Sequence, residues 1–252
     1  MLRALQLPRA TLLEGSPGVG KTTLIHAIAR AAGRSLVRIN LSEQTDMMDL
    51  LGADLPTPGG GPGQFTWADG PLLAALKAGH WVLLDELNLA NQSILEGLNA
   101  LLDHRASVYI PELGRTFTCP PTFRLFAAQN PTHQGGGRKG LPASFLNRFV
   151  RVHVEMLCRD DLCAIAAAMH PSLSANRIAS MTAFLEALAA RGSDVGEFNL
   201  RDLLRWCALV ERCSAEGGDV DSATWQMARM LTWQRMRNQA DRDAVVDAYK
   251  QV

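Results

Sequence analysis

The sequence lacks an excess of charge of either sign, since 25 lysine and arginine residues balance 25 aspartate and glutamate residues. A protein that binds nucleic acid mainly through its phosphates needs a basic surface, so we expect no direct nucleic-acid contact. Long apolar runs are also absent. About 18 such residues are needed to cross a bilayer, so we expect no membrane-spanning helix. The N-terminus does not resemble a signal peptide, which predicts a cytosolic or nuclear location.

Cysteine and aromatic residues are scarce as well. The five cysteines show no two-residue spacing of the kind used by metal knuckles and redox motifs. The six histidines show no metal-ligand spacing either. We therefore interpret the cysteines as reduced, structural thiols. They are Cys119, Cys158, Cys163, Cys207 and Cys213.

Short apolar runs alternate with helical patterns from about residue 10 to residue 154, which is typical of βαβ units and a parallel sheet. The expected strands are residues 11–14, 36–40, 81–85, 123–128 and 149–154, with helices at 21–32 and 93–103. Strand patterns end near residue 158. The expected helices that follow are residues 160–169, 174–190, 200–213, 222–237 and 240–251.

This order predicts an α/β fold: a three-layer αβα core with a parallel sheet over residues 1–156, followed by a helical lid over 157–252. Two stretches, at about 53–70 and about 107–118, interrupt the βαβ rhythm and contain Gly and Pro. We interpret both stretches as insertions on the core, the second as a hairpin.

A phosphate-binding loop is predicted by Gly15-Ser-Pro-Gly-Val-Gly-Lys21-Thr22, which fits the Gly-x4-Gly-Lys-Ser/Thr pattern between a strand and a helix. Its backbone N–H groups and the helix N-terminus suit a phosphate chain. Lys21 is expected to neutralise the β- and γ-phosphates, and the Thr22 hydroxyl to ligate Mg²⁺. The expected nucleotide-binding residues are Gly15, Ser16, Pro17, Gly18, Val19, Gly20, Lys21, Thr22 and Thr23.

Two acids follow the apolar run Trp81-Val-Leu-Leu, and a carboxylate at such a strand end suits a metal-nucleotide site. Asp85 is expected to hold Mg²⁺, and Glu86 to polarise an attacking water as general base. Alone, such a pair would more often be a solvated strand end. Together with the phosphate loop it predicts nucleotide hydrolysis, and because the guanine-reading Asn-Lys-x-Asp sequence is absent we expect the nucleotide to be ATP.

The sequence resembles the AAA+ family of P-loop ATPases, and most closely the modules of a giant dynein-related member of that family. The stretches that carry the resemblance are residues 12–22, 81–90, 110–117, 128–131, 134–149 and 198–206. The first two are general to P-loop ATPases, whereas the runs 110–115 and 134–140 are similar to the dynein-related modules in particular.

The resemblance implies catalytic roles for three residues beyond Lys21 and Glu86. Asn130 matches the sensor that orients the water, although an Asn at a strand end is as often a turn residue. Arg148 matches the arginine finger that enters the ATP site of the neighbouring module, so the isolated chain is expected to bind ATP but hydrolyse it slowly. Arg201 matches the second sensor on the lid. Alternatively Arg201 is a surface residue, and Arg205 can share either role.

The resemblance also implies partners. The expected partners are neighbouring AAA+ modules in a hexameric ring, within one longer chain, and indirectly the assembly factors that such a protein releases from precursors of the large ribosomal subunit in the nucleus. One alternative is a stand-alone, cytoplasmic MoxR-like homohexamer, and another is a structural module that binds nucleotide without hydrolysing it. The insertions are expected to face the ring's pore or a partner, or else to be solvated hairpins. The basic loop at 135–140 is expected to position Arg148, or alternatively to contact phosphate or RNA.

Overall fold

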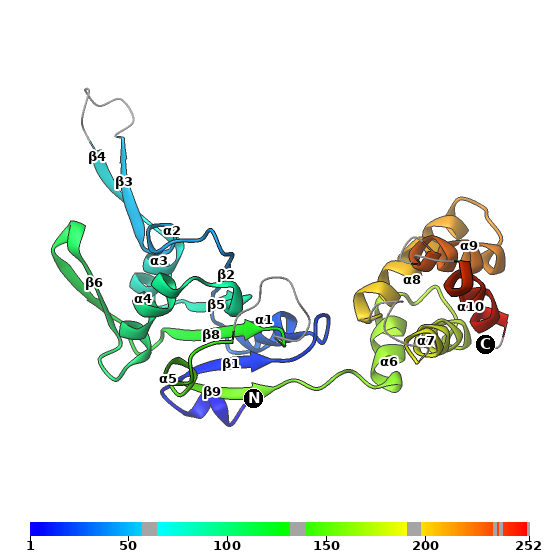
Figure 1. Ribbon diagram of the computed structural model, residues 1–252, viewed down its shortest axis with the longest axis horizontal. Coiled ribbons are helices and arrows are strands. Elements are labelled where there is room, and N and C mark those ends of the chain that lie inside the picture. Colours follow the sequence, from blue (N-terminus) through cyan, green and yellow to red (C-terminus); the bar gives the residue numbers. More distant parts are fainter. Residues whose placement is uncertain (57–64, 132–139, 191–197, 234–235, 237–238, 251–252) are drawn as a thin grey trace. The chain divides into compact units, whose positions relative to one another are not determined.

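A computed structural model of the chain describes residues 1–56, 65–131, 140–190, 198–233, 236 and 239–250. The chain forms two compact units, Met1–Glu155 and Met156–Val252. The first combines a parallel sheet with helices and the second contains only helices among its described residues (Figure 1). The expected α/β fold with a helical lid is therefore confirmed. In the described part of the chain, no helix has the length and apolar character needed to cross a membrane.

The first unit is built on a five-stranded sheet in which every pairing is parallel. Its strands, in spatial order, are β2 (Leu36–Asn40), β5 (Trp81–Asp85), β8 (Arg124–Gln129), β1 (Ala10–Glu14) and β9 (Phe149–His153). All five were expected from the sequence, to within one residue at each end. Because parallel strands end at the same edge of a sheet, the segments that follow β1, β5 and β8 meet at one place, which is where α/β proteins bind ligands.

Helices cover both faces of this sheet and give three layers. Leu13, Leu83 and Phe126 face α1 (Lys21–Ala31) in one apolar cluster. The alternate strand residues, such as Leu84 and Ala127, lie in a second cluster with α3 (Pro71–Ala78) and α4 (Gln92–Leu102). Strands buried on both faces explain why the central runs are apolar throughout instead of alternating.

Two antiparallel pairs extend from the core near α2, α3 and α4 (Figure 1). The first joins β3 (Gly52–Pro56) to β4 (Phe65–Asp69), and the second joins β6 (Ser107–Ile110) to β7 (Arg115–Thr118). Short 3-10 turns occur at Ala4–Gln6, Leu87–Leu89 and Pro111–Leu113, and two short helices are α2 (Met47–Leu51) and α5 (Ala143–Leu146).

Helices α2 and α3 were not expected from the sequence. The signals for α3 were nevertheless present, because Pro71 opens the helix and Gly79 closes it with a left-handed φ of 68°. Helix α2 has only five residues, too few for a hydrophobic period to be recognised, and it depends on the Asp46–Asp49 capping box.

The second unit contains five helices among its described residues, at the expected places: α6 (Arg159–Met169), α7 (Ala175–Ala189), α8 (Leu200–Ala215), α9 (Val220–Trp233) and α10 (Gln239–Lys250). Trp206 is fully buried, its ring lies edge-on to Phe184, and Phe184 also contacts the ring of Tyr249. His170, after α6, is 2.6 Å from the Glu211 carboxylate of α8.

Large apolar side chains do not form the most buried face of α9. Met227, Met230 and Trp233 recur every three residues, but Met230 is 55% exposed and the other two are only partly buried. The side chains that α9 buries are small, namely Ala223, Thr224, Ala228 and Thr232. Small side chains allow two helix backbones to approach closely, so the larger ones lie at the margin of the contact.

All five cysteines are free thiols in the structure. Burial raises the pKa of the Cys119 thiol to about 11, and burial together with the nearby Glu211 carboxylate raises that of Cys207 to about 11. Both thiols are therefore protonated at neutral pH, which favours the interpretation that they are structural.

The packing of the first unit predicts a large cost for Leu83→Ala. Leu83 lies at the centre of β5 with no exposed surface, so its truncation removes contacts and leaves a cavity. We expect the free energy of unfolding to fall by about 2–5 kcal/mol, measured by urea denaturation. The matched control is Leu55→Ala in the β3–β4 pair, where the side chain is 54% exposed. Equal effects of the two substitutions would contradict the assigned core.

Candidate nucleotide-binding site

The loop between β1 and α1 has the backbone geometry of a phosphate cradle. Gly18 and Gly20 have left-handed φ angles of 83° and 88°, which L side chains adopt only with strain. Gly15 is constrained by space, since a Cβ there would lie 2.4 Å from the carbonyl oxygen of Val154. The glycines at these three positions are thus required by the conformation of the loop. Helix α1 begins directly after it, and a helix N-terminus attracts anions.

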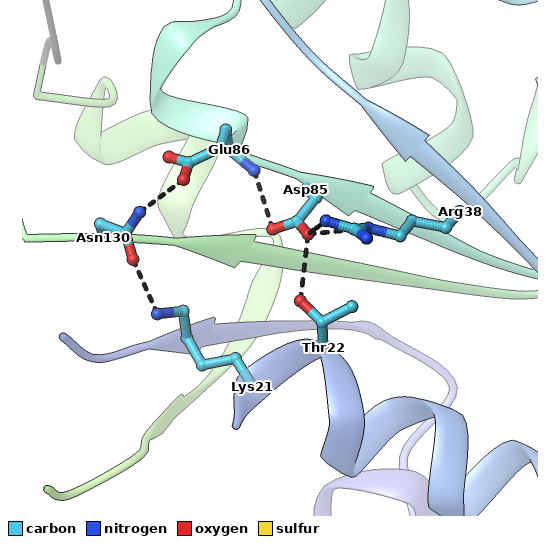
Figure 2. Close-up of polar contacts among 6 residues, drawn as sticks. All are labelled: Lys21, Thr22, Arg38, Asp85, Glu86 and Asn130. Atoms are coloured by element: carbon cyan, nitrogen blue, oxygen red, sulfur yellow. Dashed lines mark hydrogen bonds and ion pairs between the residues drawn. The ribbon is translucent and has the colours of Figure 1, made fainter. Parts of the chain in front are cut away.

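Lys21 is buried, with 7% of its surface exposed, and its ammonium group lies inside the loop. Lys21 Nζ donates to the carbonyl oxygens of Gly15 (2.7 Å) and Ser16 (2.9 Å) and to Asn130 Oδ1 (2.8 Å). Figure 2 shows the last of these contacts, which joins the start of α1 to the segment after β8. A buried ammonium surrounded by acceptors is a cation held ready for an anionic ligand.

Asp85 lies at the end of β5, where the Thr22 hydroxyl donates to its Oδ2 atom over 3.0 Å. The same oxygen accepts from Arg38 Nε (3.0 Å) and Arg38 Nη2 (2.7 Å), a contact shown in Figure 2. The other oxygen, Oδ1, accepts the Glu86 N–H at 3.2 Å. Arg38 was not predicted as a site residue. Its signal was a single charged side chain between the apolar residues Val37 and Ile39 of a predicted strand.

Glu86 and Asn130 form the second half of the constellation. Asn130 Nδ2 donates to Glu86 Oε1 over 2.6 Å, while Asn130 Oδ1 accepts from Lys21. The amide orientation follows from chemistry, since an ammonium can only donate and a carboxylate can only accept. Glu86 has φ 56° and ψ 44°, an uncommon left-handed conformation for a residue with a side chain. Such strain is concentrated at functional sites.

Asn88 is a site residue that the sequence reasoning missed. It is 1% exposed, and its Nδ2 donates to the main-chain carbonyl of Asn130 over 2.9 Å. Asn88 therefore holds the backbone whose side chain lies between Lys21 and Glu86. The available signal was its place in the stretch 81–90, three residues after Asp85.

The residues present fit a Mg²⁺–nucleotide. Thr22 and Asp85 place a hydroxyl and a carboxylate 3.0 Å apart, and such hard oxygen atoms are the ligands that Mg²⁺ prefers. The buried Lys21 ammonium and the left-handed glycines suit the phosphates. The remaining residues expected in the loop, Ser16, Pro17 and Val19, are half-buried beside them, whereas Thr23 is exposed on α1.

Two predicted site residues, Arg148 and Arg201, are not part of this constellation in the first unit. Arg148 directly precedes β9, whose first residue pairs with Ala10 at the start of β1. The phosphate loop follows the other end of β1, and five strand residues span about 16 Å, so Arg148 lies at the opposite edge of the sheet. Arg201 is in the first turn of α8 in the second unit, and its role stays a prediction. Arg138 and Lys139 lie outside the described residues.

Two family models match most of the chain. Residues 10–149 match the model described as AAA domain (dynein-related subfamily), and residues 161–252 match that of the midasin AAA lid domain. The chain therefore belongs to the dynein-related subfamily of AAA domains, whose members are AAA+ ATPase modules.

The similarity extends to particular proteins. Midasin from Dictyostelium discoideum is 54% identical over 261 residues, which covers 100% of this chain and 4% of that protein. Midasin from Giardia intestinalis is 50% identical over 216 residues, or 82% of this chain and 4% of that protein. An uncharacterized Staphylococcus aureus (strain USA300) protein is 32% identical over 157 residues, or 62% of this chain and 59% of its own length. The chain thus resembles one module of midasin and spans about 4% of its length.

The position of Asn88 predicts that the substitution Asn88→Ala lowers the stability of the first unit. The buried Asn130 carbonyl loses its donor, but Asn88 Oδ1, which has no partner among the described residues, is removed at the same time. We therefore expect a decrease of about 1–2 kcal/mol in the free energy of unfolding, measured by urea denaturation. The control is Asn147→Ala, an exposed residue of the same type. A loss no larger than that of the control would show that the contact does not hold Asn130.

Proposed function

We propose that this module binds Mg-ATP and hydrolyses it. The single observation that carries the proposal is the continuous chain of contacts from Lys21 through Asn130 to Glu86, beside the Thr22–Asp85 pair. It brings a phosphate-binding cation, a polar amide and a carboxylate to one edge of the sheet. When bound, Mg²⁺ would neutralise charge that develops on the transferred phosphate.

The residues of the chain divide the chemistry between them. In the proposed reaction Lys21 exchanges some of its three oxygen contacts for phosphate oxygens, which frees Asn130 Oδ1. Asn130 and Glu86 then hold the attacking water, and the Glu86 carboxylate accepts its proton. The left-handed backbone of Glu86 directs this carboxylate away from the line of β5 and towards Asn130.

A second module is needed to complete the site in this proposal. Arg148 lies at the sheet edge opposite the phosphate loop, farther away than an arginine side chain extends, so it cannot serve its own nucleotide within the first unit. The start of β9 is instead available to a neighbour in a ring. An arginine supplied in trans is typically worth about 10³ to 10⁵ in rate, and slow hydrolysis by the isolated chain follows.

The similarity to midasin supports a role in ribosome assembly, in which a hexameric ring of modules in the nucleus uses ATP to release assembly factors from precursors of the large subunit. The chain's balanced charge favours action through other modules and proteins instead of direct nucleic-acid contact. The alternative stand-alone ring, MoxR-like and cytoplasmic, shares the same ATP chemistry and differs only in that six identical chains would assemble.

Glu86→Gln tests hydrolysis separately from binding. The amide keeps the shape of the carboxylate but cannot accept the proton of the water, so we expect single-turnover ATP hydrolysis to fall by about 10²-fold or more with nucleotide affinity unchanged. Glu112→Gln in the β6–β7 turn, an exposed residue, is the control. If the wild-type chain is no faster than Glu86→Gln even in an assembled ring, the module binds nucleotide without hydrolysing it.

Arg148→Ala tests the trans arrangement. At concentrations where light scattering shows a monomer, we expect the slow hydrolysis by the chain to be unaffected, because Arg148 does not reach its own site. In an assembled ring the rate should fall sharply, and mixing with Glu86→Gln chains should restore part of it. A rate reduced in the monomer itself would mean that Arg148 acts in cis.

A further inference from the structure

Arg38 lies on β2, an edge strand of the sheet, and forms an ion pair with the Asp85 carboxylate at the end of the neighbouring strand β5. Both Nε (3.0 Å) and Nη2 (2.7 Å) donate to one oxygen, Oδ2. The Arg38 side chain is 49% exposed, whereas the Asp85 side chain is 11% exposed. The pair therefore joins a nearly buried carboxylate to a cation that can reach solvent.

The oxygen that Arg38 contacts also lies beside the Thr22 hydroxyl, the other expected ligand of a metal ion. Asp85 Oδ2 accepts hydrogen bonds from both the Thr22 hydroxyl and the Arg38 guanidinium (Figure 2). With these three donor atoms around it, Oδ2 has no lone pair left, so a metal ion at this oxygen would have to displace the guanidinium. Among the described residues the other oxygen, Oδ1, accepts only the Glu86 N–H at 3.2 Å, and it shares the negative charge of the same carboxylate. The Arg38 guanidinium and a divalent ion bound by Thr22 and Asp85 would therefore compete for the negative charge of Asp85.

We propose that Arg38 is a positioning residue that neutralises Asp85 in the nucleotide-free module and is displaced when Mg²⁺ arrives, so that it sets how strongly nucleotide binding depends on Mg²⁺. This inference rests on the proposed Mg-ATP function. Without a compensating cation, a carboxylate at this place repels the triphosphate. With Arg38 paired to it, nucleotide can enter before the metal does.

Two features suit Arg38 to this role and distinguish it from Lys21. Lys21 is buried and holds three oxygen atoms, so its ammonium stays inside the loop. Arg38 carries its guanidinium on a long, partly exposed stem, and an ion pair that is partly exposed is weak enough to exchange. The pair is also unnecessary for joining the two strands, because β2 and β5 are paired through their backbones along their whole length.

The test is a pair of titrations with a fluorescent ATP analogue, one in EDTA and one in saturating Mg²⁺. The quantity compared is the dissociation constant in EDTA divided by the dissociation constant in Mg²⁺. In Arg38→Gln the uncompensated Asp85 weakens binding without the metal, and we expect the ratio to rise by about three- to tenfold. Arg38→Lys, which keeps the charge, should stay close to the wild type. The matched control is Arg151→Gln, an exposed arginine on the opposite edge strand β9.

A double-mutant cycle keeps the test specific to Asp85. When Asp85→Asn removes the carboxylate charge, adding Arg38→Gln should no longer change the ratio. An unchanged ratio in Arg38→Gln, with a melting curve that shows a folded protein, would make the ion pair a structural contact only. A ratio that falls would mean that Arg38 assists the metal. Either result overturns the inference, whereas absence of nucleotide binding by the wild type in both buffers would overturn the proposed function itself.

Discussion

The contact between Lys21 and Asn130 is the interaction on which the site depends, because it joins the start of α1 to the residue after β8, 109 residues further along the chain. This contact is possible because β1 and β8 are parallel neighbours whose carboxyl ends lie at the same edge of the sheet. A glycine loop directs the ammonium inward, and Asn88 anchors the amide by its main chain. The Glu86 carboxylate then takes its position from Asn130 as well as from β5.

Charge in this site is balanced locally. Lys21 and Glu86 are linked through a neutral amide, and Asp85 is paired with Arg38, so two cations offset two anions before any ligand is present. Buried charges require such partners, because an unpaired ion out of water is very costly. In the proposed function, an incoming triphosphate and metal ion would have to rearrange these contacts. The ion pairs within the site and the binding of a charged ligand would therefore depend on each other.

The strands of the sheet could be predicted closely from the sequence because the central ones are short apolar runs. The lid helices could be predicted because their helical patterns extend over 11 to 16 residues. Short helices could not. Helix α2 depends on a capping box and on packing. The buried face of α9 is also not evident from its pattern, since small side chains are buried there while Met230 is exposed. A three-residue recurrence gives the period of a helix but does not say which side a neighbouring helix covers, and that choice depends on how closely two backbones pack.

The sequence alone predicted that the Gly-x4-Gly-Lys-Thr loop and the acids after Trp81-Val-Leu-Leu belong to one site, because the two patterns occur together in the order that a metal-nucleotide site requires. Tertiary structure decided which side chains complete it. Arg38 and Asn88 have ordinary sequence surroundings, and they become site residues only because β2 lies beside β5 and the turn after β5 lies against the end of β8. It likewise decided that Arg148 lies at the far edge of the sheet. Local sequence specifies strand, loop and helix, whereas the order of strands across a sheet is set by packing between distant segments.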